Sequence, residues 1–141
     1  MRPYLLDTNV LLALAWPSHL FHLDAGAWFS RKRKAGFRTC PLTETGFVRI
    51  SSNPSFTPEA VAPAEALALL KQMVKLPEHG FWSDDLCLQE TIGRQRLTGH
   101  RQVTDAYLLA LAAAHEGVLA TFDRGVAELA RRTGSPLELI R

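Results

Sequence analysis

Four acidic residues occur at positions from which they could act together, although they lie far apart along the chain. Asp7 follows the apolar stretch PYLL, Glu44 follows FRTCPL, and Asp123 follows VLATF. Asp105 falls in the first turn of a helix expected in VTDAYLLALA. Carboxylate oxygens are the ligands that Mg²⁺ and Mn²⁺ prefer, and these ions suit substrates that carry phosphate. The four acids therefore indicate metal-assisted hydrolysis of a phosphodiester bond.

The simpler explanation for each acid is a helix cap. An acidic side chain in the first turn of a helix accepts hydrogen bonds from free backbone amides and complements the helix dipole. This explanation weakens when the four acids are considered together. Carboxylates gathered at one place would repel each other strongly unless a cation lay among them. We therefore favour a metal site and keep capping as the alternative.

The elements that must position these acids alternate between short apolar runs and helices. Strands are expected at residues 3–6, 37–40, 81–82, 118–121 and 137–140. Helices are expected at residues 10–16, 21–35, 64–75 and 103–115, with further helices beginning at Pro41, at Ser83 or Asp84 as the cap, and in DRGVAELARR. This order predicts an α/β fold, a three-layer α/β/α domain around a central, mainly parallel sheet of about four to five strands. The carboxyl ends of parallel strands share one edge, so the four acids can meet there.

Size and composition fit one domain over residues 1–141. A hydrophobic fraction of 47% and a charged fraction of 21% are typical of soluble globular proteins and exclude disorder. The net charge of +2 permits nucleic-acid binding without indicating it. Cys40 and Cys87 are expected to be buried thiols, and neither a disulfide nor a zinc site is indicated. Asp7 and Asn9 interrupt the apolar N-terminal stretch, so we expect neither a signal peptide nor a membrane span, and a cytoplasmic protein.

Four stretches carry a resemblance to a known family. LLDTNVLLAL, TETGFVRI, VTDAYLLALA and LATFDRGVAEL resemble, in order, the successive acidic motifs of the PIN-domain nucleases. The most similar members are the VapC toxins of bacterial type II toxin–antitoxin pairs. The resemblance extends from Tyr4 to about Ile140, and it is the ordered set of motifs that is specific. It implies a PIN-like fold and a single PIN domain.

The resemblance also implies roles for the acids. Asp7 and Asp105 would contact Mg²⁺, or Mn²⁺ in its place, while Glu44 and Asp123 would act through water or complete a second, weaker metal site. Asn9 and Thr8 would shape the turn around Asp7. The implied activity is that of a toxin: an endoribonuclease in which metal-activated water attacks phosphorus in line, and which a small antitoxin protein blocks.

Several basic residues could contact RNA. His100 and Arg101 precede Asp105, and Arg124 directly follows Asp123, so these three are the predicted contacts with substrate phosphates. Arg49, beyond Glu44, could touch either the acids or the substrate. The run from Arg31 to Lys34 is interpreted first as a solvated helix end, with RNA or an acidic partner as the alternative.

Two further patterns are interpreted as structural. The H-x-x-H spacing of His19 and His22 suggests capping or packing, since nitrogen ligands do not suit an acidic oxygen site. Asp84 and Asp85 are interpreted as a helix cap outside the site. The apolar surface of HLFHLDAGAWF could serve a homodimer, which we expect, or antitoxin binding.

Two other functions compete with the nuclease. A phosphatase with an aspartyl nucleophile is disfavoured, because Asn9 stands where a second acid is needed and no lysine follows Lys75. A PIN-like module that binds RNA or protein without catalysis stays open. The RNA substrate also stays open, since transfer RNA and ribosomal RNA are both compatible with the family.

Overall fold

The computed structural model describes residues 1–93 and 95–141, and within them five strands form one parallel sheet. The strands are β1 (Tyr4–Leu6), β2 (Phe37–Thr39), β3 (His79–Phe81), β4 (Val118–Thr121) and β5 (Leu137–Leu139). Their order across the sheet is β3-β2-β1-β4-β5, and each neighbouring pair is parallel. The predicted parallel sheet is therefore confirmed.

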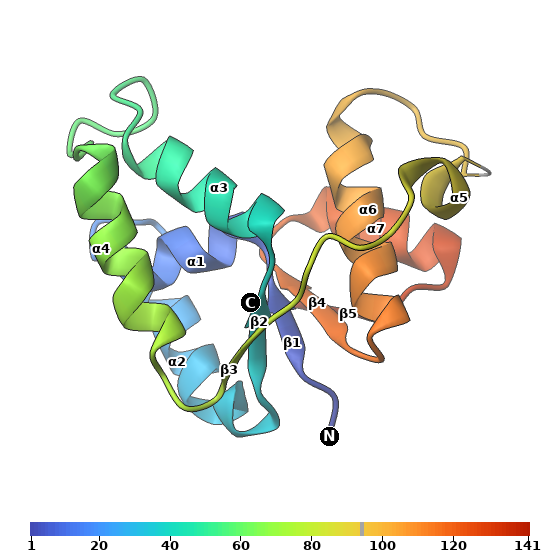
Figure 1. Cartoon of the computed structure of the whole chain (residues 1–141), viewed down its shortest axis with the longest axis horizontal. Helices are drawn as coiled ribbons and strands as arrows, with labels where there is room; N and C mark the ends of the chain where they lie inside the picture. The colour runs from blue at the N-terminus through green and yellow to red at the C-terminus, as the bar shows by residue number, and fades with distance from the viewer. Residues whose placement is uncertain (94) are drawn as a thin grey trace.

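Helices cover both faces of this sheet, which confirms the three-layer arrangement. One group comprises α1 (Thr8–Ala15), α2 (His22–Lys32), α3 (Pro41–Ser51) and α4 (Pro63–Val74). The other group comprises α5 (Leu88–Ile92), α6 (Arg101–Ala114) and α7 (Arg124–Thr133). The two groups lie on opposite sides of the strands (Figure 1). Among the described residues, no helix has the length and apolar character needed to cross a bilayer.

The two central strands, β1 and β4, are buried on both faces. Leu5 and Leu119 pack into the core formed with α6 and α7, whereas Leu6 and Ala120 pack into the core formed with α1 to α4. Successive side chains of a strand point to opposite faces, so uninterrupted apolar sequence is what such strands require. Leu6 pairs with Ala120, and this register places the next residues, at the ends of β1 and β4, side by side.

Several element boundaries differ from the prediction, among them α1, which begins at Thr8 rather than Val10, and β3, which spans His79–Phe81 rather than residues 81–82. Helix α6 begins at Arg101, two residues early, so Asp105 lies beyond its first turn. The helix expected after Ser83 or Asp84 is α5, which begins only at Leu88, so the capping role predicted for Asp84 and Asp85 is wrong. The reason is packing: Trp82 and Leu86 lie against the core around α6, which keeps the intervening chain extended. Asp85 instead pairs with His115 at 3.6 Å.

The two cysteines are free, but only one is buried as predicted. Cys40 is fully enclosed at the end of β2, whereas Cys87 is exposed at the start of α5. Cys87 was predicted to be buried because the sequence around it is apolar. The short helix α5 has no fully buried residue, and its flanking segment lies at the surface.

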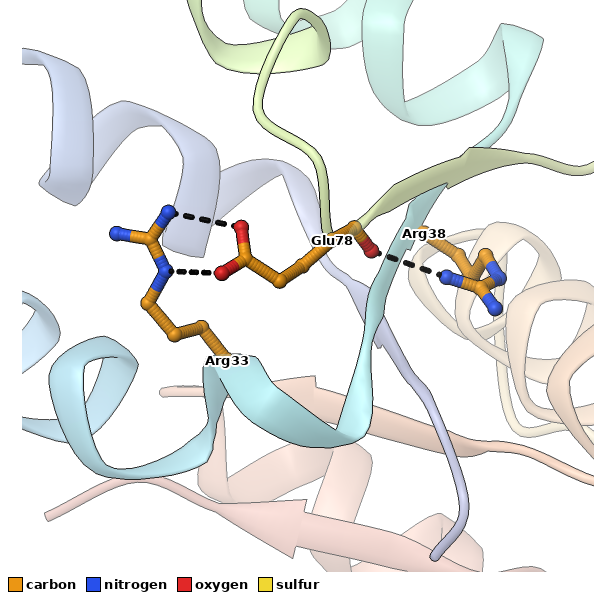
Figure 2. A network of polar contacts seen from close by, with 3 residues as sticks. All are labelled: Arg33, Arg38 and Glu78. Atoms are coloured by element: carbon orange, nitrogen blue, oxygen red, sulfur yellow. Dashed lines mark hydrogen bonds and ion pairs between the residues drawn. The ribbon is translucent and has the colours of Figure 1, made fainter.

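The basic run at the end of α2 is partly used within the fold. Arg33 forms two hydrogen bonds with the Glu78 carboxylate, at 2.8 and 3.1 Å, and Arg38 donates to the Glu78 carbonyl at 3.3 Å (Figure 2). Lys32 lies 3.8 Å from Glu138. Arg33 begins the 3₁₀ helix η1 (Arg33–Ala35) that follows α2, and Arg38 lies in β2, so these contacts tie η1 and β2 to the segment before β3, while Lys32 ties α2 to β5. Lys32 and Arg33 therefore have partners within the fold rather than solvent alone, and contact of this basic run with RNA or an acidic partner stays a prediction.

Gly117, which follows α6, is required by packing and not by its backbone conformation. The residue with a left-handed backbone at the end of α6 is Glu116, with φ of 57°. A Cβ atom at Gly117 would lie 2.5 Å from Cη2 of Trp82 and 2.9 Å from the carbonyl oxygen of Pro3. The glycine thus lets Trp82 and the N-terminal strand approach the end of α6.

The close packing around Gly117 and the open space around Gly26 predict opposite effects of two Gly→Ala substitutions. Gly117→Ala should lower the free energy of unfolding by about 1–3 kcal/mol, because the added methyl group overpacks the site. Gly26→Ala, within α2 and with no heavy atom inside 4 Å of the new Cβ, should raise it by about 0.5–1 kcal/mol. Urea unfolding of both variants measures this, and an unchanged stability of Gly117→Ala would contradict the packing account.

Candidate active site

Asp7 lies at the end of β1 and is 8% exposed. One carboxylate oxygen, Oδ1, accepts a hydrogen bond from the Thr8 amide at 2.8 Å and so caps α1. The other oxygen, Oδ2, accepts from the Thr121 hydroxyl at 2.8 Å. The capping interpretation is therefore correct for Asp7, but it accounts for only one of the two oxygens.

Thr121, the last residue of β4, connects the strand ends. Its buried hydroxyl donates to Asp7 and accepts from the Asn9 side-chain amide and the Asp123 backbone amide, both at 3.1 Å. Asn9 in turn accepts from the Phe122 amide at 3.3 Å. A hydroxyl group can donate one hydrogen bond and accept two. All three positions of the Thr121 hydroxyl are used, so its orientation is defined. No role was predicted for Thr121. The available signal was its hydroxyl group at the end of the strand in VLATF, one of the strand ends where the acids were expected to meet.

Asp105 and Asp123 approach the same place from two helices. Asp123 is exposed and caps α7, with Oδ1 accepting from the Gly125 amide at 2.7 Å. Asp105 is half-buried, and α6 has no acidic residue in its first turn, so Asp105 does not cap the helix. Capping thus explains two of the acids and leaves Asp105 unexplained.

The charges of these three acids act on one another. Burial, together with the charges of the Asp7 and Asp123 carboxylates, raises the pKa of Asp105 to about 7. Burial also raises the pKa of Asp7, with a smaller contribution from Asp123, against hydrogen bonds from Thr121 and Thr8 that lower it. Asp7, Asp105 and Asp123 are therefore coupled, and a bound cation would relieve their repulsion.

The donors at this site suit a hydrated Mg²⁺ or Mn²⁺ ion. They are carboxylate oxygens, as hard divalent cations prefer. Within residues 1–93 and 95–141, no three acidic, histidine or cysteine side chains lie close enough to enclose an ion by themselves. Mg²⁺ keeps several waters and is commonly held by one or two carboxylates, so this open arrangement fits it.

Glu44 lies in the first turn of α3, at the end of the neighbouring strand β2. Its Oε2 accepts a hydrogen bond from the Thr39 hydroxyl at 2.6 Å, and the same hydroxyl lies 2.7 Å from Nε2 of His79. Glu44 is not among the charges that raise the pKa of Asp7 or Asp105. The structure thus couples three of the four predicted acids and places the fourth at the adjacent strand end.

Helix α3 is held close to α1, which sets where Glu44 can lie. A Cβ atom at Gly46 would lie only 2.7 Å from the Thr8 hydroxyl oxygen, so the glycine permits this approach. The Thr8 hydroxyl also lies 3.4 Å from the Thr43 carbonyl oxygen, to which it donates. The residue after Asp7 and the residue before Glu44 are therefore in contact.

The predicted RNA-contacting residues are exposed at the starts of two helices. His100 and Arg101 lie at the beginning of α6, and Arg124 lies at the beginning of α7, next to Asp123. Their contact with RNA stays a prediction. The two histidines near α2 pack locally as expected: His22 Nδ1 bonds the Ala13 carbonyl at 2.7 Å, and His19 Nδ1 accepts from the Phe21 amide at 3.0 Å.

Comparison with known proteins agrees with this geometry. The PIN domain family matches residues 4–132. The ribonuclease VapC39 of Mycobacterium tuberculosis is 46% identical over 128 residues, covering 89% of this chain and 92% of the relative. The ribonuclease VapC38 of the same organism is 44% identical over 137 residues, covering 96% of both.

Solved structures show the same fold at low sequence identity. VapBC2 from Rickettsia felis, bound to a DNA fragment from its promoter, matches with a TM-score of 0.67 at 12% identity and covers 99% of both chains. A domain of a functionally unknown protein from Methanocaldococcus jannaschii matches with a TM-score of 0.56 at 14% identity, covering 100% of this chain and 92% of the other. Given the order of the acidic motifs, the parallel sheet and these relatives, the chain belongs to the PIN-domain family, within the group of VapC ribonucleases.

Proposed function

We propose that this protein is a divalent-metal-dependent endoribonuclease that acts as the toxin of a type II toxin–antitoxin pair. The observation that carries the proposal is the coupling of Asp7, Asp105 and Asp123 at the strand edge, where the pKa of Asp105 is about 7. The repulsion among these carboxylates costs stability, so the cluster is best explained by chemistry. The relatives named ribonucleases supply the substrate class.

Each acid has a part in the proposed mechanism. Asp7 and Asp105 would hold Mg²⁺, with Mn²⁺ as a substitute, and Asp123 and Glu44 would bind its waters. The metal, when bound, supplies a more acidic water and neutralises charge that develops on the phosphate. Thr121 and the Thr8 amide fix the Asp7 carboxylate before substrate arrives. Exposed His100, Arg101 and Arg124 would contact RNA phosphates on either side of the scissile bond.

The proposed partners follow from the same assignment. A small antitoxin protein would block the site, as suggested by the VapBC2 complex from R. felis. Leu20 and Leu23, which are 86% and 83% exposed, give the α2 region an apolar surface for an antitoxin or for a second copy in a homodimer. We propose that the whole chain acts as a single PIN domain in the cytoplasm, on structured loops of transfer or ribosomal RNA.

Cleavage assays with an active-site variant test the nuclease. Purified protein should cleave transfer RNA or ribosomal RNA fragments with Mg²⁺ or Mn²⁺, and EDTA should stop the cleavage. Asp105→Asn should lower the rate by more than about 100-fold, because losing a metal-ligating carboxylate should exceed the loss typical of outer-shell groups. Gel analysis of end-labelled RNA measures the rate, and exposed Asp24→Asn is the matched control.

Two results would contradict the proposal. Equal rates for wild type and Asp105→Asn would overturn the site assignment. Absence of cleavage across a broad RNA panel would favour a PIN-like module that binds without catalysis. The toxin role has a separate test: induced expression should arrest growth unless a neighbouring small protein is co-expressed, and harmless expression would remove that role while leaving the nuclease.

The raised pKa of Asp105 predicts how stability depends on pH. Its folded-state pKa of about 7 exceeds the ordinary value of 3.8, so the folded state binds the proton more tightly than the unfolded state does. This contribution to stability is complete below about pH 4 and is lost as pH rises to about 7. In EDTA, Asp105→Asn should therefore be more stable than wild type at pH 8, and the difference should shrink towards pH 5.

Thermal unfolding of the two proteins across this pH range makes the comparison. Addition of Mg²⁺ should raise the melting temperature of the wild type more than that of Asp105→Asn, since binding to the folded state alone stabilises it. Asp24→Asn should show no comparable pH-dependent difference from wild type. If the difference in melting temperature between wild type and Asp105→Asn did not change with pH, the pKa of Asp105 would not be raised in the folded protein.

A further inference from the structure

A chain of two short hydrogen bonds joins the edge strand β3 to Glu44. The Thr39 hydroxyl donates to Glu44 Oε2 at 2.6 Å and lies 2.7 Å from His79 Nε2. Thr39 ends β2 and pairs with Phe81 of β3, so the three side chains come from two strands and the start of α3. The proposed mechanism uses Glu44 but leaves His79 without a role.

The direction of these bonds follows from counting hydrogens. A hydroxyl has one hydrogen, and here it is donated to the Glu44 carboxylate. Nε2 of His79 must then donate to the hydroxyl oxygen, which requires the hydrogen on Nε2. If Nε2 accepted instead, the hydroxyl hydrogen would turn away from Glu44 and two acceptor oxygens would face each other at 2.6 Å. His79 therefore determines which way the Thr39 hydroxyl points.

The surroundings hold this chain in one arrangement. Thr39 is fully buried, and the His79 ring packs against Phe37 with ring centroids 5.3 Å apart. Burial lowers the pKa of His79, and Arg38 lowers it further while Glu44 opposes this effect. A neutral ring with a single N–H group is sufficient for the bond to Thr39. The Glu44 carboxylate, which a flexible side chain would otherwise leave mobile, is thus fixed at one oxygen.

We propose that His79 is a positioning residue that, through the Thr39 hydroxyl, orients the Glu44 carboxylate towards the metal-bound water. This inference rests on the proposed function, because His79 is assigned to support Glu44, one of the acids of the proposed site. Groups that orient the ligands or the waters of a metal typically change affinity or activity by about 10- to 100-fold. With Oε2 bonded to Thr39, the other oxygen, Oε1, would be free to bind a metal-bound water.

The test compares variants that keep shape and remove only the hydrogen bonds. His79→Phe keeps a ring against Phe37, and Thr39→Val keeps the branched side chain. Both should raise the Mn²⁺ concentration for half-maximal RNA cleavage by about 10-fold or more, and Glu44→Gln should do the same. His79→Gln, whose amide can donate to Thr39, should recover part of the loss. His115→Phe is the matched control, since His115 stacks on Trp82 at the other end of α6.

The double variant separates positioning from a purely structural role. If His79 acts only through Glu44, His79→Phe combined with Glu44→Gln should be no worse than Glu44→Gln alone. Losses that multiply would overturn the proposal, as would a His79→Phe protein that behaves like wild type. Melting temperatures of the single variants should lie within a few degrees of wild type. If His79→Phe fails to fold, Thr39→Val takes its place in the comparison.

Direct Mn²⁺ binding supplies a readout that does not depend on cleavage. Free Mn²⁺ measured by electron paramagnetic resonance should show weaker binding, by about 10-fold, in His79→Phe and in Thr39→Val, and unchanged binding in His115→Phe. If wild type cleaves no RNA, the proposed function fails, and the Mn²⁺ titration alone decides whether His79 supports the site. If wild type cleaves RNA and His79→Phe matches it in both assays, only the inference fails.

Discussion

The pairing of β1 with β4 is the constraint on which the site depends. Leu6 lies opposite Ala120, so Asp7 and Thr121 follow side by side and bond at 2.8 Å. Each strand is buried on both faces, which leaves little freedom to shift this register, because a one-residue slip would reverse every side chain. Asp123 then begins α7 from the same edge. The apolar interior thus determines where the charged groups must lie.

This arrangement places a charged cluster where a purely structural protein would avoid one. Burial and the charges of Asp7 and Asp123, which together raise the pKa of Asp105 to about 7, make its charged form costly in the metal-free protein. The three carboxylates differ in their hydrogen bonds. Asp7 accepts hydrogen bonds at both oxygens and Asp123 caps a helix, whereas Asp105 does not cap α6. Stability is given up at Asp105, and a bound cation would restore it.

The sequence predicted the layers, the parallel sheet and the candidate acids, because these depend on local pattern and on the rule that parallel strands end at one edge. It failed where tertiary packing overrides local signals. Trp82 and Leu86 pack against the core where a helix cap was expected, so the chain there is not helical, and Cys87 is exposed although its apolar neighbours predicted burial. The contacts of Thr121 and His79 join residues 114 and 40 positions apart, and no local pattern encodes them.

Whether Asp7, Asp105 and Asp123 act on one another at a single site is decided by a carboxyl titration of the metal-free protein, followed by ¹³C NMR. Asp105 should titrate with a pKa of about 7, this pKa should fall when Asp123 is replaced by Asn, and saturating Mg²⁺ should abolish titration in this range. A pKa near the ordinary value of 3.8 for Asp105, unaffected by Asp123→Asn, would show that the three acids do not share a site.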